Sequence, residues 1–176
     1  MAGALPAAFE ALAASGPHPD HRDELMLFGQ FVGSWDLDVT WYEAGNTIRR
    51  EKGEWHFAWV LEGRAVQDIW IVPPRVERGA RSDLYEYGSS MRFYDPAIGA
   101  WRSTWIGPMH GVVIPFIARG IGDEIVLEGR HADDDRPMRW VFSEISRERF
   151  LWRNTVSSDE GQSWTTQQDF VCRRVA

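Results

Sequence analysis

Apolar and polar residues alternate along most of the chain after Gly33. From Trp35 to Trp41 every second residue is apolar, and Asp or Thr occupies the positions between them. Successive side chains of a strand point to opposite faces, so this alternation is typical of a strand with one buried face. The pattern recurs and predicts ten strands, at about residues 35–42, 54–59, 64–72, 84–94, 100–106, 112–119, 124–130, 138–145, 150–157 and 163–173.

The links between these predicted strands are mostly short turns rich in Gly, Pro and Asp, such as residues 95–99 and 120–123. Strands joined by tight turns are antiparallel neighbours. A ten-stranded antiparallel sheet twists until its edges tend to meet. A sandwich would need longer crossovers, and only residues 73–83 form a link of that length. We therefore expect an all-β protein, an up-and-down barrel of about ten antiparallel strands.

Residues 1–31 follow a different pattern. Short helices are expected at about residues 6–15 and 23–31, and in the second one Leu25, Phe28 and Phe31 form a single apolar edge. A helix of this length is marginal by itself, so its apolar edge must dock on something larger. The sequence thus predicts an N-terminal helical arm, residues 1–31, and a β-barrel domain, residues 32–176.

The N-terminus and the cysteine content suggest a compartment. The first fifteen residues contain no Lys or Arg, and Glu10 interrupts them, which is unlike a secretory signal. Cys172 is the single cysteine, which excludes an internal disulfide and a zinc site built from cysteine alone. Both observations favour the cytoplasm. No apolar run of about 18 residues occurs, so no membrane span is expected.

Charge and motifs exclude several classes of function. The formal net charge is -7, with 26 acidic against 19 basic residues, whereas a nucleic-acid partner requires a basic face. The chain lacks the sequence motifs of serine hydrolases, phosphate-binding loops, zinc proteases and dinucleotide-binding domains. A metal site would need the scattered His56, His110 and His131 to converge, so no metal is expected.

Tryptophan is the unusual feature of the composition, with 10 in 176 residues. Six of them fall on the apolar faces of predicted strands. A ten-stranded barrel is too wide to be filled by small aliphatic side chains, so it either packs large rings or retains a cavity. A ligand pocket and a solid aromatic core both remain open. For the pocket, the predicted ligand-binding residues are Trp41, Trp55, Trp59, Trp70, Tyr85, Met91, Trp101 and Trp105.

Three residues are candidates for acid–base chemistry inside the barrel. Asp68 shares the apolar face of its strand, so if that face is inward the carboxylate must be paired or protonated, and Arg92, Arg102 or Arg153 could supply the charge. His110 lies in a loop between two glycines, where it can reach a cavity mouth. Tyr87 shares a face with Tyr85 and Met91, and an inward hydroxyl can bond a ligand. The structural alternatives are an ion pair, a solvated loop histidine and simple packing.

Two features of the chain resemble a known family. The first strand opens with Gly33-Ser34-Trp35, and the last strand ends in Arg173-Arg174. This is similar to the lipocalins and related calycin barrels, in which a terminal Arg packs over the Trp of a Gly-x-Trp motif and closes the barrel floor. The resemblance implies that Arg173 or Arg174 covers Trp35, and that the helix before Gly33 plugs the barrel.

Further motifs, at residues 61–64 (Leu-Glu-Gly-Arg), 93–96 (Phe-Tyr-Asp-Pro) and 101–105 (Trp-Arg-Ser-Thr-Trp), resemble bacterial calycin-like domains of unassigned function. The resemblance covers roughly residues 31–174 and implies a calycin-like fold with a barrel cavity, but no reaction. Haem-binding, nitrobindin-like barrels place an axial His near the carboxyl end. This chain has no His after His131, which disfavours haem, although His110 or His56 could serve as the ligand.

Four functions follow from this sequence. The first is a carrier that binds a small apolar molecule, aromatic or acyl-chain, without a cofactor. The second is a cofactor-free enzyme of the isomerase, cyclase or hydratase type that uses Asp68, His110 and Tyr87. The third is a haem-binding barrel. The fourth is a structural module whose aromatics only form a core and whose barrel face pairs as a homodimer.

Overall fold

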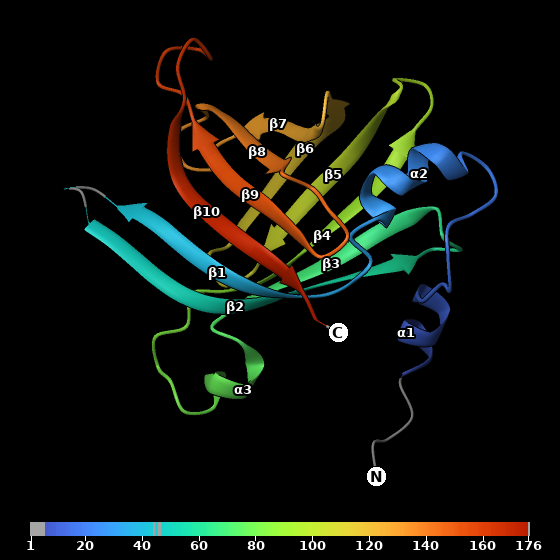
Figure 1. Cartoon of the computed structure of the whole chain (residues 1–176), viewed down its shortest axis with the longest axis horizontal. Coiled ribbons are helices and arrows are strands. Elements are labelled where there is room, and N and C mark those ends of the chain that lie inside the picture. Colours follow the sequence, from blue (N-terminus) through green and yellow to red (C-terminus); the bar gives the residue numbers. More distant parts are fainter. Residues whose placement is uncertain (1–5, 44, 46, 176) are drawn as a thin grey trace.

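The computed structural model describes residues 6–43, 45 and 47–175. In this part of the chain, antiparallel strands close into a barrel in which each strand pairs with the next and β10 pairs with β1 (Figure 1). The strands are β1 Gly33–Glu43, β2 Thr47–Val60, β3 Ala65–Val72, β4 Glu86–Asp95, β5 Ala100–Gly107, β6 Val112–Ile121, β7 Glu124–Arg130, β8 Pro137–Ser143, β9 Arg149–Val156 and β10 Thr165–Arg174. The predicted up-and-down antiparallel barrel is confirmed.

The largest difference from the predicted strands is in β2, which begins at Thr47 rather than near residue 54. Its first residues pair with the end of β1, from Glu43 back to Asp38. The sequence Thr-Ile-Arg-Arg-Glu-Lys carries no apolar alternation, because Arg49 and Glu51 take the positions that point toward the barrel interior. Two charged residues therefore lie on the inner face of β2 at this end of the barrel.

Three short helices accompany the barrel: α1 Ala7–Leu12, α2 Arg22–Gly29 and α3 Arg75–Arg78. Helix α2 lies over one end of the barrel, as Figure 1 shows, and buries Leu25 and Phe28 there. The Phe28 ring packs edge-on against Trp101 at 4.9 Å. Helix α3 lies in the link between β3 and β4, which the sequence pattern predicted as a loop. None of the helices in the described residues is long and apolar enough to cross a membrane.

The end covered by α2 is called the closed end below. Residues from the first and last strands of the barrel, Trp35 and Arg174, pack together there. The indole Nε1 of Trp35 donates a hydrogen bond to the Phe31 carbonyl oxygen at 2.7 Å. Of the two candidate arginines, Arg174 covers the Trp35 ring, with its guanidinium carbon 4.1 Å from the ring centroid. Arg173 points outward and pairs with Asp38. A side chain at Gly33 would meet the Arg174 guanidinium, and φ there is +131°, so glycine suits this position for two reasons.

Large rings fill the closed half of the barrel interior. Trp55 lies within 6 Å of Phe57, Phe142, Phe150 and Phe170, measured between ring centroids. The remaining rings of this layer pack in the same way: Trp152 and Phe170 are stacked at 4.3 Å, and Phe31 contacts Phe57, Phe142 and Phe150. The expectation of a solid aromatic core therefore holds for this half of the barrel.

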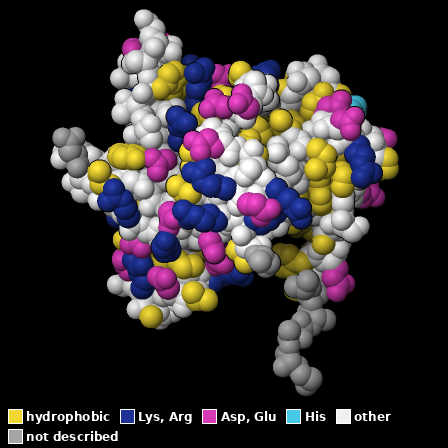
Figure 2. All heavy atoms as spheres, in the orientation of Figure 1, with side chains coloured by type: hydrophobic (Ala, Val, Ile, Leu, Met, Phe, Trp, Pro, Cys, Tyr) yellow, Lys and Arg dark blue, Asp and Glu magenta, His cyan; other side chains and the backbone are white. Residues whose placement is uncertain are grey.

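Charged side chains cover the outer face of the barrel in alternating sign. On the face seen in Figure 2, Lys and Arg lie among Asp and Glu rather than in a single basic patch. Asp38 is an example, since it lies between Lys52 on one neighbouring strand and Arg173 on the other. Hydrogen bonds from these two residues hold the pKa of Asp38 below its ordinary value.

Candidate functional site

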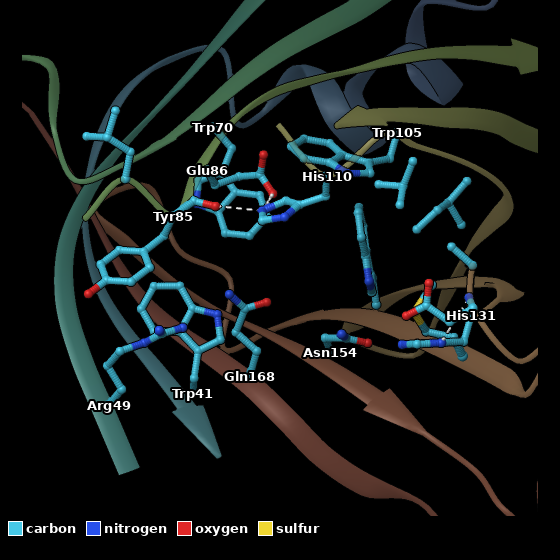
Figure 3. A pocket seen from close by; sticks show the side chains of 17 residues that line it. Trp41, Arg49, Trp70, Tyr85, Glu86, Trp105, His110, His131, Asn154 and Gln168 are labelled. Carbon is cyan, nitrogen blue, oxygen red and sulfur yellow. Dashed lines mark hydrogen bonds and ion pairs between the residues drawn. The ribbon is translucent and has the colours of Figure 1, made fainter. Parts of the chain in front are cut away.

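In an up-and-down barrel, alternate strand connections lie at the same end. The connections β1–β2, β3–β4, β5–β6, β7–β8 and β9–β10 all lie opposite α2, at the end called the open end below. A cavity of about 410 Å³ opens there (Figure 3). Its lining residues are Trp41, Arg49, Trp70, Leu84, Tyr85, Glu86, Trp105, His110, Val112, Ile114, His131, Ala132, Asp133, Met138, Trp140, Asn154 and Gln168.

Three tryptophans supply most of the flat apolar lining of this pocket. Trp70 lies 5.3 Å from Trp105, and Trp105 lies 5.9 Å from Trp140, between ring centroids. Trp152 supports this layer, with its ring 5.3 Å from Trp140 and 6.1 Å from Trp70. The aromatic interior therefore continues from the filled half into the hollow half. There the rings of Trp70, Trp105 and Trp140 form the pocket wall.

Several polar atoms of the lining side chains are buried and have no hydrogen-bond partner among the residues that the structure describes. The indole Nε1 atoms of Trp70 and Trp140 and the amide Nε2 of Gln168 are donors, and these three residues are each at most 7% exposed. Asn154 Oδ1 is a buried acceptor that also lacks a hydrogen-bond partner among the described residues. An unpartnered buried polar group costs about 1–3 kcal/mol. The filled core holds such atoms as well, for example Trp55 Nε1 and Trp152 Nε1, but those of the pocket lining are the ones that a ligand can reach.

Arg49 occupies one side of the pocket mouth. Its guanidinium lies between two rings, 4.5 Å from Trp41 and 4.2 Å from Tyr85 (Figure 3). Its Nη2 also lies 3.3 Å from Glu43 Oε1. Two aromatic faces and a carboxylate fix this cation at the rim, where its remaining N–H groups are available to an anionic or carbonyl oxygen.

Glu86 and His110 meet on another side of the mouth. Glu86 is the first residue of β4, with its side chain only 9% exposed, and His110 comes from the β5–β6 loop. His110 Nε2 lies 2.7 Å from the Tyr85 carbonyl oxygen and 3.4 Å from Glu86 Oε2 (Figure 3). Burial raises the pKa of Glu86, and the neighbouring His110, the Tyr87 backbone N–H and Arg78 oppose this shift in part.

Of the residues that the sequence suggested for a site, Trp41, Trp70, Tyr85, Trp105 and His110 line this pocket. Trp55, Trp59 and Trp101 point inward but lie elsewhere. Trp55 belongs to the filled layer, and Trp59 and Trp101 pack against α2, where the Trp59 ring occupies the space beside Gly29.

Met91 and Tyr87 lie on the outer face of β4, so the structure does not bring them to the pocket. Tyr87 is 40% exposed, and the Arg78 guanidinium lies 5.1 Å from its ring. The expectation that Tyr85 and Tyr87 share a face was wrong, because Tyr85 precedes β4 and does not follow the alternation of that strand.

Asp68 points into the barrel, as one sequence alternative held, but it does not line the pocket. It is fully buried and pairs with Arg92, and its Oδ1 also accepts a hydrogen bond from the Ser90 backbone N–H at 3.2 Å. The Arg92 guanidinium lies 5.0 Å from the Phe28 ring of α2. The pair therefore belongs to the closed half, away from His110 at the open end.

Sequence reasoning missed Glu86, Arg49, Trp140, Asn154 and Gln168. The pattern of β4 is inverted, since Glu86, Gly88, Ser90 and Arg92 point inward while Tyr87, Met91 and Phe93 point outward. One signal was available. An inward Asp68 requires an inward cation. If that cation is Arg92, alternation along the strand places every second residue before it, back to Glu86, on the inner face as well.

Comparison with known proteins supports the fold. No protein-family model and no curated protein matches the sequence. Among solved structures, the protein is similar to Rv2717c from M. tuberculosis, at 14% identity and a TM-score of 0.57, covering 91% of this chain and 99% of that one. It is also similar to the S-type phycobiliprotein lyase CPES from Guillardia theta, at 10% identity and a TM-score of 0.56, covering 86% and 92%. These similarities and the closed barrel fit the calycin-like fold that the sequence motifs predicted.

Proposed function

We propose that this protein binds a small planar aromatic molecule, one that carries hydrogen-bond acceptor atoms, in the pocket at the open end. The supporting geometry is a cavity of about 410 Å³ whose flat walls are the rings of Trp70, Trp105 and Trp140. A volume of this size is within the range of small-molecule pockets, which are mostly apolar with a few placed polar groups. The similarity to a phycobiliprotein lyase is compatible with a small ligand.

The observation that carries this proposal is the excess of unpartnered donors. Four buried donors of the lining are unpartnered, against the single acceptor Asn154 Oδ1: Trp70 Nε1, Trp140 Nε1, Gln168 Nε2 and Arg49 Nε. Arg49 adds a fixed cation at the mouth. A ligand that presents carbonyl, carboxylate or ring-nitrogen acceptors satisfies these donors, whereas a pure hydrocarbon leaves them unpaired. Flat indole walls favour a planar ring over an acyl chain.

Quenching of tryptophan fluorescence tests the proposal directly, because three tryptophans form the wall. The panel contains naphthalene, a naphthoate, a neutral naphthyl ketone and a fatty acid. We expect saturable quenching by the naphthoate and the ketone, with tighter binding than naphthalene. No saturable quenching by any aromatic compound would refute the proposal, and a clear preference for the fatty acid would refute the aromatic class.

A matched pair of variants locates the binding. Trp140→Phe keeps an aromatic wall but removes one unpartnered donor, so we expect the affinity for the naphthoate or ketone to fall about 5- to 10-fold, the value of one hydrogen bond. Naphthalene binding should be unchanged. Trp164→Phe is the control, since Trp164 does not line the pocket and its ring lies 4.2 Å from the Arg139 guanidinium. It should leave all affinities unchanged.

A further inference from the structure

We infer that Glu86 and His110 form a proton-transfer pair at the pocket mouth, in which His110 removes a proton from the bound ligand and Glu86 positions the imidazole. This inference rests on the proposed ligand pocket and adds an activity to it. Both residues line the cavity, and they reach it from different elements, β4 and the β5–β6 loop. The activity is cofactor-free base catalysis on an acidic C–H or O–H group of an aromatic ligand.

The contacts of His110 determine which ring nitrogen is the base. The Tyr85 carbonyl oxygen accepts a hydrogen bond and cannot donate one, so Nε2, at 2.7 Å, must carry the hydrogen. The neutral ring then has its lone pair on Nδ1, and Nδ1 makes no hydrogen bond to any residue that the structure describes. A ring held through one nitrogen and open at the other is the arrangement that a general base requires.

Glu86 is placed to support the charge that forms during catalysis. Its Oε2 is 3.4 Å from Nε2, the nitrogen that stays protonated throughout, and its Oε1 accepts the Tyr87 backbone N–H at 3.0 Å. A carboxylate beside Nε2 stabilises the imidazolium that appears when Nδ1 takes a proton. Because Glu86 acts through His110, it is a positioning residue.

The other charged groups around the pair come from several elements. Arg78 of α3 donates to the Glu86 backbone carbonyl at 2.9 Å, and Asp83 accepts from the Tyr85 hydroxyl at 3.3 Å. The Arg49 guanidinium lies 4.2 Å from the Tyr85 ring, and His131 and Asp133 of the β7–β8 loop also line the pocket. The His110 side chain is 54% exposed, so the proton it takes can be released to water.

A nitrobenzisoxazole is a suitable probe, because it is a planar aromatic carbon acid with ring acceptor atoms. In the balanced step, His110 Nδ1 takes the ring C–H proton and the electrons of that bond complete a nitrile. The ring N–O bond breaks, and its electron pair stays on the oxygen of a coloured cyanophenolate. The imidazolium then returns its proton to water, so no oxidant or second substrate is needed.

The experiment measures turnover and binding of this probe on the full-length protein. We expect His110→Gln to lower the elimination rate by at least about 100-fold, the usual contribution of a general base, while quenching shows that the probe still binds. Glu86→Gln should keep measurable turnover and lower kcat by less than His110→Gln does, with the KM for the probe unchanged, because Glu86 acts through the imidazole. His56→Gln is the matched control.

His56 suits this role because its ring Nε2 lies 2.9 Å from Glu54 Oε2, a similar His–Glu pair placed outside the pocket. Its loss should leave the rate unchanged. Nitrogen-15 NMR on the free protein gives an independent measurement, and we expect neutral His110 to carry its proton on Nε2.

The outcomes separate the two proposals. If the wild-type protein does not bind the probe or any other aromatic compound, the pocket function and the proton-transfer pair both fail. If the probe binds but the wild-type rate equals that of His110→Gln, the pair alone is refuted. A neutral His110 with its proton on Nδ1 also refutes it, and so does a Glu86→Gln variant that loses as much rate as His110→Gln.

Discussion

The guanidinium of Arg174 lies 4.1 Å above the Trp35 ring and joins the last strand of the barrel to the first. The same group donates hydrogen bonds to the carbonyl oxygens of Gln30 and Val32, each at 2.8 Å. These carbonyls lie between α2 and β1, where backbone groups at a helix end need partners. One side chain therefore closes the barrel floor and attaches α2 to it.

Replacing Arg174 should destabilise the protein without affecting the pocket. We expect Arg174→Ala to lower the free energy of unfolding by about 2–4 kcal/mol, from one cation–π contact and the lost charged hydrogen bonds. Urea unfolding measures the change. Arg174→Lys keeps the charge but cannot bond several carbonyls at once, so its loss should be intermediate. An Arg174→Ala variant as stable as the wild type would contradict this role.

The stability of the protein should depend on Glu54 in acid. Partial burial raises the pKa of Glu54, but hydrogen bonds from Arg75 and His56 outweigh it and hold the pKa at about 2, against an ordinary 4.5. A depressed pKa contributes stability that is complete above pH 4.5 and is lost as the pH falls toward 2.

Glu54→Gln should therefore lose less stability than the wild type over that interval, as measured by urea unfolding at a series of pH values. Glu62→Gln is the control, because the Glu62 side chain is 83% exposed and should leave the acid response unchanged. Identical acid profiles for Glu54→Gln and the wild type would refute the expectation.

The buried pair of Asp68 and Arg92 should matter for folding rather than for ligand binding. Asp68→Asn leaves the Arg92 charge without its counter-ion, and we expect a loss of about 3–5 kcal/mol in the free energy of unfolding. The double variant Asp68→Asn, Arg92→Met should recover part of this loss, because Arg92 Nε and Nη2 already lack partners among the described residues. Thermal and urea unfolding compare the three proteins. A double variant that is less stable than Asp68→Asn would contradict the expected recovery of stability.

Gly88 should control the shape of the pocket wall. A Cβ atom at Gly88 would lie 2.3 Å from the Trp105 ring, so this ring rests directly against the backbone of β4. Gly88→Ala forces Trp105 to move toward the cavity, and we expect at least about a tenfold loss of affinity for the aromatic ligand, roughly 1.4 kcal/mol. Gly79→Ala is the control, since nothing lies within 4 Å of its Cβ position. Fluorescence titration measures both variants, and equal affinities would refute this role.

Local pattern predicted the strands well where one face is apolar and the other polar. β1 is the clearest case, because alternation from Trp35 to Trp41 sets both the strand and its inner face. The short links then fix the neighbours of each strand, and with them the barrel. The Gly-x-Trp motif with a terminal arginine also predicted a real contact, although only the structure distinguishes Arg174 from Arg173.

The same reasoning failed where the inner face is polar. β4 points Glu86, Ser90 and Arg92 inward, where Arg92 pairs with the buried Asp68 and Glu86 lines the pocket. At the start of β2, Arg49 points to the pocket for a similar reason. The alternation argument assumes that apolar side chains face the barrel interior. It therefore assigns the wrong face wherever a pocket or a buried ion pair places polar side chains inside.

By itself, the sequence determined the strand pattern, the meander topology and the excess of indole rings, because each of these depends on residues close together in the chain. The tertiary structure alone decided which half of the barrel is filled and which is hollow. Phe28, Phe31 and Trp101 meet only when α2 folds over one end, whereas Trp70, Trp105 and Trp140 line the cavity at the other end. The meeting of Glu86 with His110 likewise depends on strand pairing, because β4 and β5 lie side by side and bring the start of β4 next to the β5–β6 loop.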